Sequence, residues 1–203
     1  MTNKNTLLLI AAAAWLAGCA SKPTLYYTLA GPPGAARPAM AAPLFIELAP
    51  VVVPERLARP QLVVRQSGSA QGPQVEVLEQ HRWSSSFETE LRDALAEGIA
   101  ERLGAIDVTK GGRVGGQPLW RIAVQLRQFD AVENARVDAA FSWSALRVGE
   151  ERSAYCQWSA SEPVGGGIEA LAQGAQRVSA KAAEAIARHV AALQADPAAA
   201  CQS

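Results

Sequence analysis

Five residues of this chain carry a thiol or an imidazole group, the side chains that most often act as nucleophiles, bases or metal ligands: Cys19, Cys156, Cys201, His81 and His189. Their spacing in the sequence matches neither a zinc site nor a nucleophile paired with a base. The glycine-rich stretch GGRVGG also lacks the lysine and hydroxyl of a phosphate-binding loop. We therefore expect no catalytic residue, no metal ligand and no cofactor. The cysteine whose setting points to chemistry is Cys19.

Cys19 follows an apolar run at residues 7–17, which has a single basic residue, Lys4, ahead of it. The run is much shorter than the roughly 20 residues that cross a bilayer. A basic start, a short apolar core and small residues before a cut are typical of a secretory signal peptide. The tetrapeptide LAGC at 16–19 resembles the bacterial lipobox, in which the cysteine sulfur receives a diacylglycerol and the chain is cut before it. We expect residues 1–18 to be the signal peptide and Cys19 to be lipidated.

The residues after Cys19 predict the membrane that holds the lipid. In signals of this kind an aspartate after the cysteine retains the product in the inner membrane, whereas Ala20 and Ser21 follow here. Two acyl chains already anchor a protein stably. The motif therefore predicts a lipid-anchored protein at the periplasmic face of the outer membrane. The alternative is an ordinary secreted protein in which Cys19 is a free thiol.

The charge balance of the mature chain argues against a nucleic-acid partner. Cleavage before Cys19 removes one of the 19 basic residues and none of the 19 acidic ones, so the remaining 185 residues carry a net charge of −1. Binding to phosphates needs a clustered basic surface. A chain of this length forms one domain. We expect a lipid anchor, short strand and Pro/Ala-rich linker at 19–43, an α+β domain at 44–195 and a flexible tail at 196–203.

The apolar pattern predicts the elements of the domain. Strands are expected at 25–29, 44–54, 61–66, 74–81, 118–132, 136–148 and 153–163, with a hairpin formed by the third and fourth and an antiparallel meander by the last three. Apolar residues recur every three or four positions at 87–103 and 168–193, which predicts two amphipathic helices. Ser85 or Ser86 can cap the first helix, and Gly104 ends it. The fold class is α+β: an antiparallel sheet with both helices packed on one face, in a single domain.

The Pro/Ala-rich residues 30–43 allow two arrangements of the anchor. As an extended spacer they could reach on the order of 40 Å and let the domain stand off the membrane. The apolar segment LYYTL at 25–29 favours a strand that returns to the sheet. In that case the linker is a surface loop and the anchor is held close to the domain.

Several single residues have competing interpretations. Cys156 is interpreted as a small core residue on a strand, and a disulfide to Cys201, which an oxidising periplasm allows, stays open. His189 falls beside the apolar stripe of the second helix and is expected to be partly exposed. Glu47 lies in an otherwise apolar strand, where a cross-strand arginine would explain it.

Three arginines around the segment PERLARP are candidates for partner binding. Arg56, Arg59 and Arg65 lie within ten positions of one another, next to prolines that interrupt the sheet. They predict a docking surface for an acidic partner. The alternative is that they are solvated charges on a loop.

The order of these segments resembles the ABC-type transport auxiliary lipoproteins, the PqiC family. The resemblance covers most of the mature chain and rests on an ordered set of cues: Tyr26, Tyr27 and Leu29 after the anchor; Val51 to Pro54, Arg59, Pro60 and Leu62 to Arg65 around an apolar strand; and Arg82 and Trp83 before the first helix.

The resemblance implies a non-catalytic outer-membrane lipoprotein that acts beside a transporter. Such a transporter has a periplasmic subunit with a mammalian-cell-entry (MCE) domain and moves phospholipids or other hydrophobic molecules between the membranes. Docking to a symmetric conduit predicts a homo-oligomer, and Tyr26 and Tyr27 join the three arginines as docking candidates. The alternative function is a stand-alone lipoprotein that binds a small amphipathic ligand in its own cavity.

Overall fold

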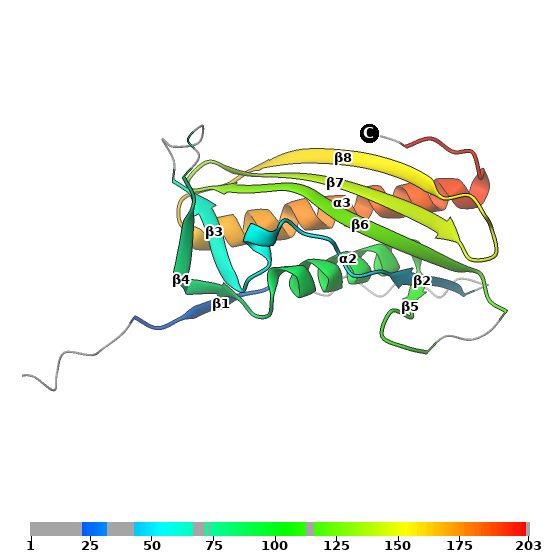
Figure 1. The fold of residues 1–203 in the computed structure, drawn as a ribbon, viewed down its shortest axis with the longest axis horizontal. Helices are drawn as coiled ribbons and strands as arrows, with labels where there is room; N and C mark the ends of the chain where they lie inside the picture. The colour runs from blue at the N-terminus through cyan, green and yellow to red at the C-terminus, as the bar shows by residue number, and fades with distance from the viewer. Residues whose placement is uncertain (1–21, 32–42, 67–71, 73, 113–115, 202–203) are drawn as a thin grey trace, which may run out of the picture.

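The structure is a computed structural model that describes residues 22–31, 43–66, 72, 74–112 and 116–201. In this part of the chain eight strands form one sheet, and two long helices cover one of its faces (Figure 1). The strands are β1 (Leu25–Tyr27), β2 (Leu44–Leu48), β3 (Gln61–Arg65), β4 (Glu76–Trp83), β5 (Ala105–Asp107), β6 (Leu119–Val132), β7 (Arg136–Arg147) and β8 (Ala154–Pro163). The helices are α2 (Phe87–Leu103) and α3 (Ile168–Ala195), with a short 3-10 turn, η1 (Glu55–Leu57), ahead of β3.

The sheet is organised around β6. β6, β7 and β8 form the predicted antiparallel meander, and β3 and β4 form the predicted hairpin. The α+β class and the single domain are thus confirmed. The expectation of a wholly antiparallel sheet needs correction, because β2 and β3 both pair with β6 in parallel, β5 with β2 in parallel, and β1 with β4 in parallel. Parallel pairs arise here because helix α2 separates β2 and β3 from β6 in the sequence.

Helix α2 begins and ends at the predicted caps. The Ser86 hydroxyl accepts a hydrogen bond from the backbone N–H of Thr89, and Gly104 adopts the left-handed conformation with φ of 61°. The apolar stripe at every fourth residue is buried, from Phe87 to Leu103. α2 packs directly on α3, and a Cβ at Gly98 would lie 2.9 Å from the Cβ of Ala183. The close approach of the two helices therefore requires a glycine at position 98.

The core lies between the helices and the sheet. The inward faces of β6 and β7 are buried as the alternation predicts: Trp120, Ile122, Val124, Leu126, Val137, Ala139, Phe141 and Trp143. A register shift between Leu126 and Gln128 lets Phe129 also face the core, where its ring lies 5.0 Å from that of Phe87. The predicted arginine partner of Glu47 is Arg121, its neighbour on β6, at 3.2 Å. Within the described residues, neither helix is both long and apolar enough to cross a membrane.

Candidate functional site

Cys19, the proposed lipid attachment point, lies outside the described residues, as do the signal peptide and residues 32–42 of the linker. The described chain resumes close to it, at Lys22, and enters strand β1. β1 pairs with the last residues of β4, so the apolar segment after the anchor returns to the sheet. The interpretation that residues 25–29 belong to the domain is therefore confirmed for Leu25–Tyr27.

The residues that follow β1 are clamped by a buried carboxylate. Glu90, on the first turn of α2, is 8% exposed. Its side chain accepts hydrogen bonds from the Thr28 hydroxyl at 2.8 Å and from the backbone N–H of Leu29 at 3.0 Å. The hydroxyls of Ser84 and Ser85 donate to its other oxygen. One carboxylate thus joins the segment after β1, the β4–α2 loop and helix α2.

Neutral donors keep this buried carboxylate ionised. Burial by itself raises the pKa of Glu90, but the hydrogen bonds from Ser84, Leu29, Thr28 and Ser85 outweigh it and hold the pKa below its usual range. Sequence reasoning missed this residue. The signal that could have found it is the position of Glu90 in the first turn of a helix that begins directly after three consecutive serines, whose hydroxyls can donate to a carboxylate.

A second contact fixes the same segment to helix α3. The side-chain amide of Gln176 donates to the carbonyl oxygens of Thr28 and Ala30, at 2.8 and 3.2 Å. Leu29, between them, is fully buried in the core. The segment after β1 is therefore held by both helices.

The structure brings two of the three candidate arginines together and separates the third. Arg56 and Arg65 both face Asp130, at 3.8 and 3.2 Å. Arg56 also donates to the carbonyl oxygen of Phe129 and Arg65 to that of Gly72. Both side chains therefore have an internal ion-pair partner, Asp130, and at least one internal hydrogen bond. Arg59 is exposed, and its guanidinium has no ion-pair partner within the described part of the chain.

Of the two candidate tyrosines of β1, one has an internal partner and the other is exposed. Tyr27 is half-buried, shares a hydrogen bond of 2.9 Å with His81 Nδ1 and stacks on that ring. Burial, and then the carboxylate of Glu169, raise the pKa of Tyr27, so that its phenol stays protonated. Tyr26 points the other way and is 66% exposed. Of the candidate docking residues, Arg59 and Tyr26 are thus the most available for an external contact.

A cluster of chemically active side chains forms at β8 where the sequence predicts none. Cys156 and Cys201 are joined in a disulfide, so the pairing left open by the sequence is made and the tail is fastened to β8. The expectation that His189 is partly exposed is wrong. His189 is 3% exposed, and its Nδ1 accepts a hydrogen bond of 3.0 Å from Trp143 Nε1. Burial lowers the pKa of His189, so the ring is neutral at pH 7.

The donor atoms of Cys156, His189 and Cys201 lie within 4.8 Å of one another, a set that zinc accepts elsewhere. The observed contacts do not fit a metal. The two sulfurs are bonded to each other, and thiolates rather than disulfide sulfurs ligate metals. Because Nδ1 accepts the indole proton, the neutral ring carries its own proton on Nε2, which removes the second lone pair. This cluster is therefore a structural disulfide beside a buried histidine.

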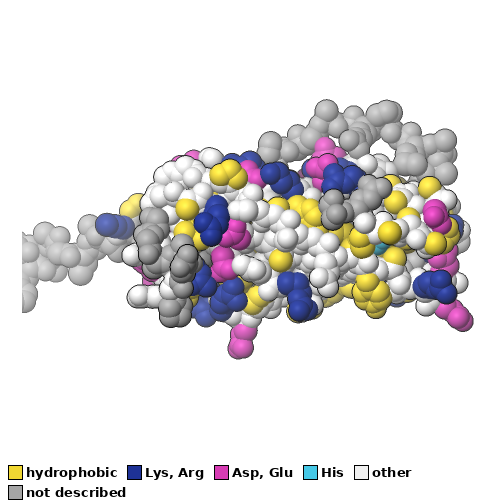
Figure 2. Space-filling view, turned by 90° about the horizontal axis from the view of Figure 1, so that it is seen from above, with side chains coloured by type: hydrophobic (Ala, Val, Ile, Leu, Met, Phe, Trp, Pro, Cys, Tyr) yellow, Lys and Arg dark blue, Asp and Glu magenta, His cyan; other side chains and the backbone are white. Residues whose placement is uncertain are grey.

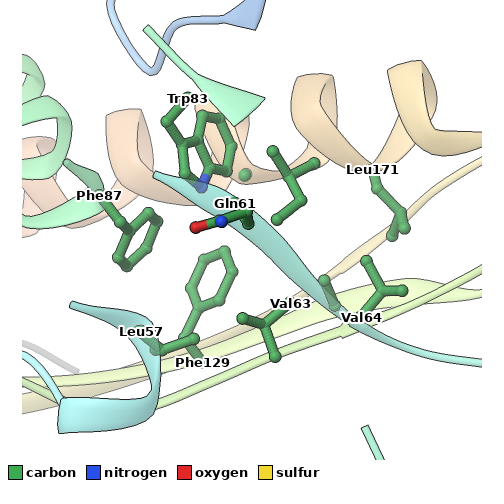
Figure 3. Close-up of a pocket in the computed structure, with 11 residues that line it drawn as sticks. Leu57, Gln61, Val63, Val64, Trp83, Phe87, Phe129 and Leu171 are labelled. Carbon is green, nitrogen blue, oxygen red and sulfur yellow. The ribbon is translucent and has the colours of Figure 1, made fainter. Parts of the chain in front are cut away.

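The core contains a small apolar cavity between the two layers. It is lined by Leu57, Leu62, Trp83, Phe87, Phe129, Leu171 and their neighbours, and has a volume of about 20 Å³. Figure 3 shows the rings of Trp83, Phe87 and Phe129 gathered around it, with centroid separations of 5.6 and 5.0 Å between successive rings. This volume holds about one water molecule and no lipid.

Charges of both signs share the surface. Figure 2 shows lysine and arginine side chains interspersed with aspartate and glutamate on the face in view. Many of the ion pairs in the described residues are local. Five join residues within four positions of each other: Arg82–Glu79, Arg92–Asp93, Arg136–Asp138, Arg147–Glu150 and Arg188–Glu184. Two join residues on paired strands: Arg121–Glu47 and Arg65–Asp130. On the face in view, basic side chains are therefore accompanied by acidic ones.

Comparisons with known proteins agree with the fold and with the order of the motifs. A family model described as the ABC-type transport auxiliary lipoprotein component matches residues 27–187. A solved structure described as an uncharacterized protein superposes with a TM-score of 0.62 at 19% identity, over 83% of this chain and 99% of its own. A DUF330 protein from Xanthomonas campestris superposes with a TM-score of 0.59 at 13% identity, over 87% and 99%. At these identities the structures show likeness of fold alone. No curated protein matches significantly.

Proposed function

The chain belongs to the family of ABC-type transport auxiliary lipoprotein components, and we propose that it is a non-catalytic docking component of such a transporter. The proposed partner is a periplasmic subunit with an MCE domain, and the proposed cargo is phospholipid or another hydrophobic molecule. The domain receives the end of a conduit that is rooted in the inner membrane.

The proposed anchor is a lipid on Cys19 at the periplasmic face of the outer membrane. Residues 1–18 act as the signal peptide, and 19–43 contain the anchor, strand β1 and the linker to the body at 44–195. The LAGC motif and the absence of an aspartate after it support this assignment. The clamp on Thr28 and Leu29 supports an anchor that is held close to the domain.

The size of the core cavity is the observation that favours docking over solitary transport. A carrier that shuttles an amphipathic ligand by itself needs a pocket of roughly 300–1,000 Å³. The cavity between the sheet and the helices measures about 20 Å³. The larger hollows, of about 410 and 440 Å³, are surface depressions lined in part by charged side chains such as Arg127, Glu184 and Arg188, and lie outside this core. The wall of the core cavity is made of fully buried side chains such as Phe87 and Leu171, which would have to move apart to admit a ligand.

Among the candidate docking residues, Arg59 is the first choice. It is exposed and lacks an internal ion-pair partner in the described chain, whereas Arg56 and Arg65 are engaged by Asp130. An unpaired guanidinium can form a two-pronged hydrogen bond with a carboxylate of a partner. Tyr26 is exposed on edge strand β1, and Tyr27 is hydrogen bonded to His81.

A homo-oligomer is part of the proposal, because a ring of lipoproteins matches a symmetric conduit better than one copy does. Strand β5 lies at one edge of the sheet and β8 at another, and within the described part of the chain each has a neighbouring strand on one side only. Two different edges on one protomer are what a head-to-tail ring requires. Light scattering of the full chain in detergent tests this, and a strictly monomeric mass contradicts it.

Photo-crosslinking in intact cells tests the docking function. A photoreactive residue replaces Arg59 in one variant and Arg152, an exposed arginine of the β7–β8 connection, in the matched control. We expect Arg59 to capture a subunit with an MCE domain, identified by mass spectrometry, and Arg152 to capture none. Capture at Arg152 alone would move the docking surface to the opposite end. Recovery of lipid alone at both positions would favour the solitary carrier.

A further inference from the structure

The chain between the lipid and the sheet is too short to let the domain move far from its membrane. Leu25 lies six positions after Cys19, with five residues between them. At full extension each residue spans about 3.5 Å, so Leu25 lies within about 20 Å of the lipidated sulfur. This distance is a property of the covalent chain and holds for any conformation of the intervening residues.

The start of β1 also has a fixed position on the domain. Tyr27 is hydrogen bonded to His81, and Glu90 and Gln176 hold Thr28 from both helices. The anchor therefore pulls on a rigid point rather than on a hinge. Figure 1 shows that point at one end of the long axis, with residues 22–24 directed outward from the body.

Exposed apolar side chains gather at this point. Leu25 is 49% exposed and Tyr26 is 66% exposed, in a strand of only three residues. Lys22, also exposed, precedes them. A tyrosine with an apolar ring and a polar hydroxyl suits the boundary between acyl chains and headgroups, and a lysine nearby suits the phosphate groups.

We propose that Leu25, Tyr26 and Lys22 form a contact with the surface of the membrane into which the lipid on Cys19 inserts. The proposal rests on the lipidation of Cys19 and adds the orientation of the domain. The end that carries β1 faces the lipid headgroups. The opposite end, where β8 begins and α3 finishes, faces the periplasm (Figure 1). Tyr26 then contacts lipid, and Arg59 stays available to a protein partner.

The chain provides a matched control for this contact. Tyr155, the second residue of β8, is 76% exposed and also lies on an edge strand, at the end of the molecule away from β1. The fluorescent amino acid dansylalanine replaces Tyr26 in one variant and Tyr155 in the other. Each lipidated full chain is reconstituted into vesicles of phosphatidylethanolamine and phosphatidylglycerol, with or without phospholipids brominated near the headgroup.

We expect the probe at Tyr26 to shift its emission to the blue and to lose most of its intensity with brominated lipid, and the probe at Tyr155 to do neither. Equal, weak quenching at both positions in protein that floats with the vesicles would overturn the contact while leaving the lipid anchor intact. A blue shift at Tyr26 that follows protein concentration, without quenching, would mean that a second copy covers the site and would also overturn it. Protein that fails to float would overturn the lipidation on which both proposals depend.

Discussion

At the scale of single residues, the carboxylate of Glu90 is notable because it accepts four hydrogen bonds. It has no cation beside it in the described chain and is held by three hydroxyls and one backbone N–H. Such hydrogen bonds stabilise the ionised form specifically, because a protonated carboxyl accepts fewer of them. The attachment of the segment after β1 therefore depends on the charge of this one side chain.

Replacement of Glu90 by Gln is expected to lower stability at neutral pH by about 2 kcal/mol, because hydrogen bonds to a charged acceptor are lost. The pKa of Glu90 is lowered in the folded chain from the ordinary value of 4.5. Its contribution is thus complete above pH 4.5 and is lost as the pH falls below it. Urea denaturation at neutral and acidic pH measures this. The variant should lose part of that acid dependence, and Glu97→Gln, an exposed position on the same helix, should keep it.

His189 also makes the stability of the fold depend on pH, in a higher pH range than Glu90 does. Burial lowers its pKa from 6.5, so the unfolded chain takes up a proton below pH 6.5 while the folded ring stays neutral. Stability is therefore complete above pH 6.5 and falls as the pH drops below it. In His189→Gln, which retains an acceptor for Trp143, we expect the fall in melting temperature between pH 7.5 and 5.5 to shrink. An unchanged fall would assign it to other groups.

At the scale of elements, β8 and α3 are joined twice. Glu162 of β8 forms ion pairs with Arg177 and Lys181 of α3 at 2.6 and 2.5 Å, and these hydrogen bonds lower the pKa of Glu162. At the other end of β8 the disulfide fastens the residues that follow α3. The edge strand of the sheet is thus held at both ends against the helix that covers it.

Reduction of the disulfide is expected to lower the free energy of unfolding by about 2–4 kcal/mol, because the bridge closes a loop of 45 residues. Urea denaturation with and without dithiothreitol measures the difference. Cys201→Ser should unfold like the reduced chain and be insensitive to the reductant. If reduction leaves the midpoint of the wild-type chain unchanged, the tail does not stabilise β8.

At the scale of the whole molecule, the anchor and the fold are separable. The contacts that hold the start of the chain, from Tyr27 to Ala30, are made by protein side chains alone. The domain should therefore fold without the proposed lipid on Cys19.

A chain with residues 1–18 replaced by an ordinary cleavable signal peptide and Cys19 by Ser tests this separation. The signal is replaced because Cys19→Ser alone would leave the apolar run uncut. We expect the product to lose palmitate labelling and to move to the soluble periplasmic fraction, with the melting temperature of the domain unchanged. Retention in the outer membrane would show that protein contacts suffice to hold it there.

The sequence by itself determined the elements that depend on near neighbours. The four-residue repeat from Phe87 to Leu103, its caps at Ser86 and Gly104, and the alternation along β6 and β7 were all predicted and confirmed. The prediction of lipidation at Cys19 also rests on four consecutive residues, and it stays a prediction. Periodicity and capping are local properties, because each residue contacts others only a few positions away.

Only the tertiary structure decided which distant groups meet. The partners of Glu90 on the N-terminal segment lie 61 and 62 positions away, Trp143 and His189 are separated by 46, and the two bonded cysteines by 45. The parallel pairing of β2 and β3 with β6 also joins residues that are far apart in the sequence. Such contacts follow the path of the chain through the sheet, which no local period encodes. The proposed orientation rests on the clamp that holds Thr28 and Leu29, and the proposed function rests on the size of the core cavity. Both became visible only in the folded molecule.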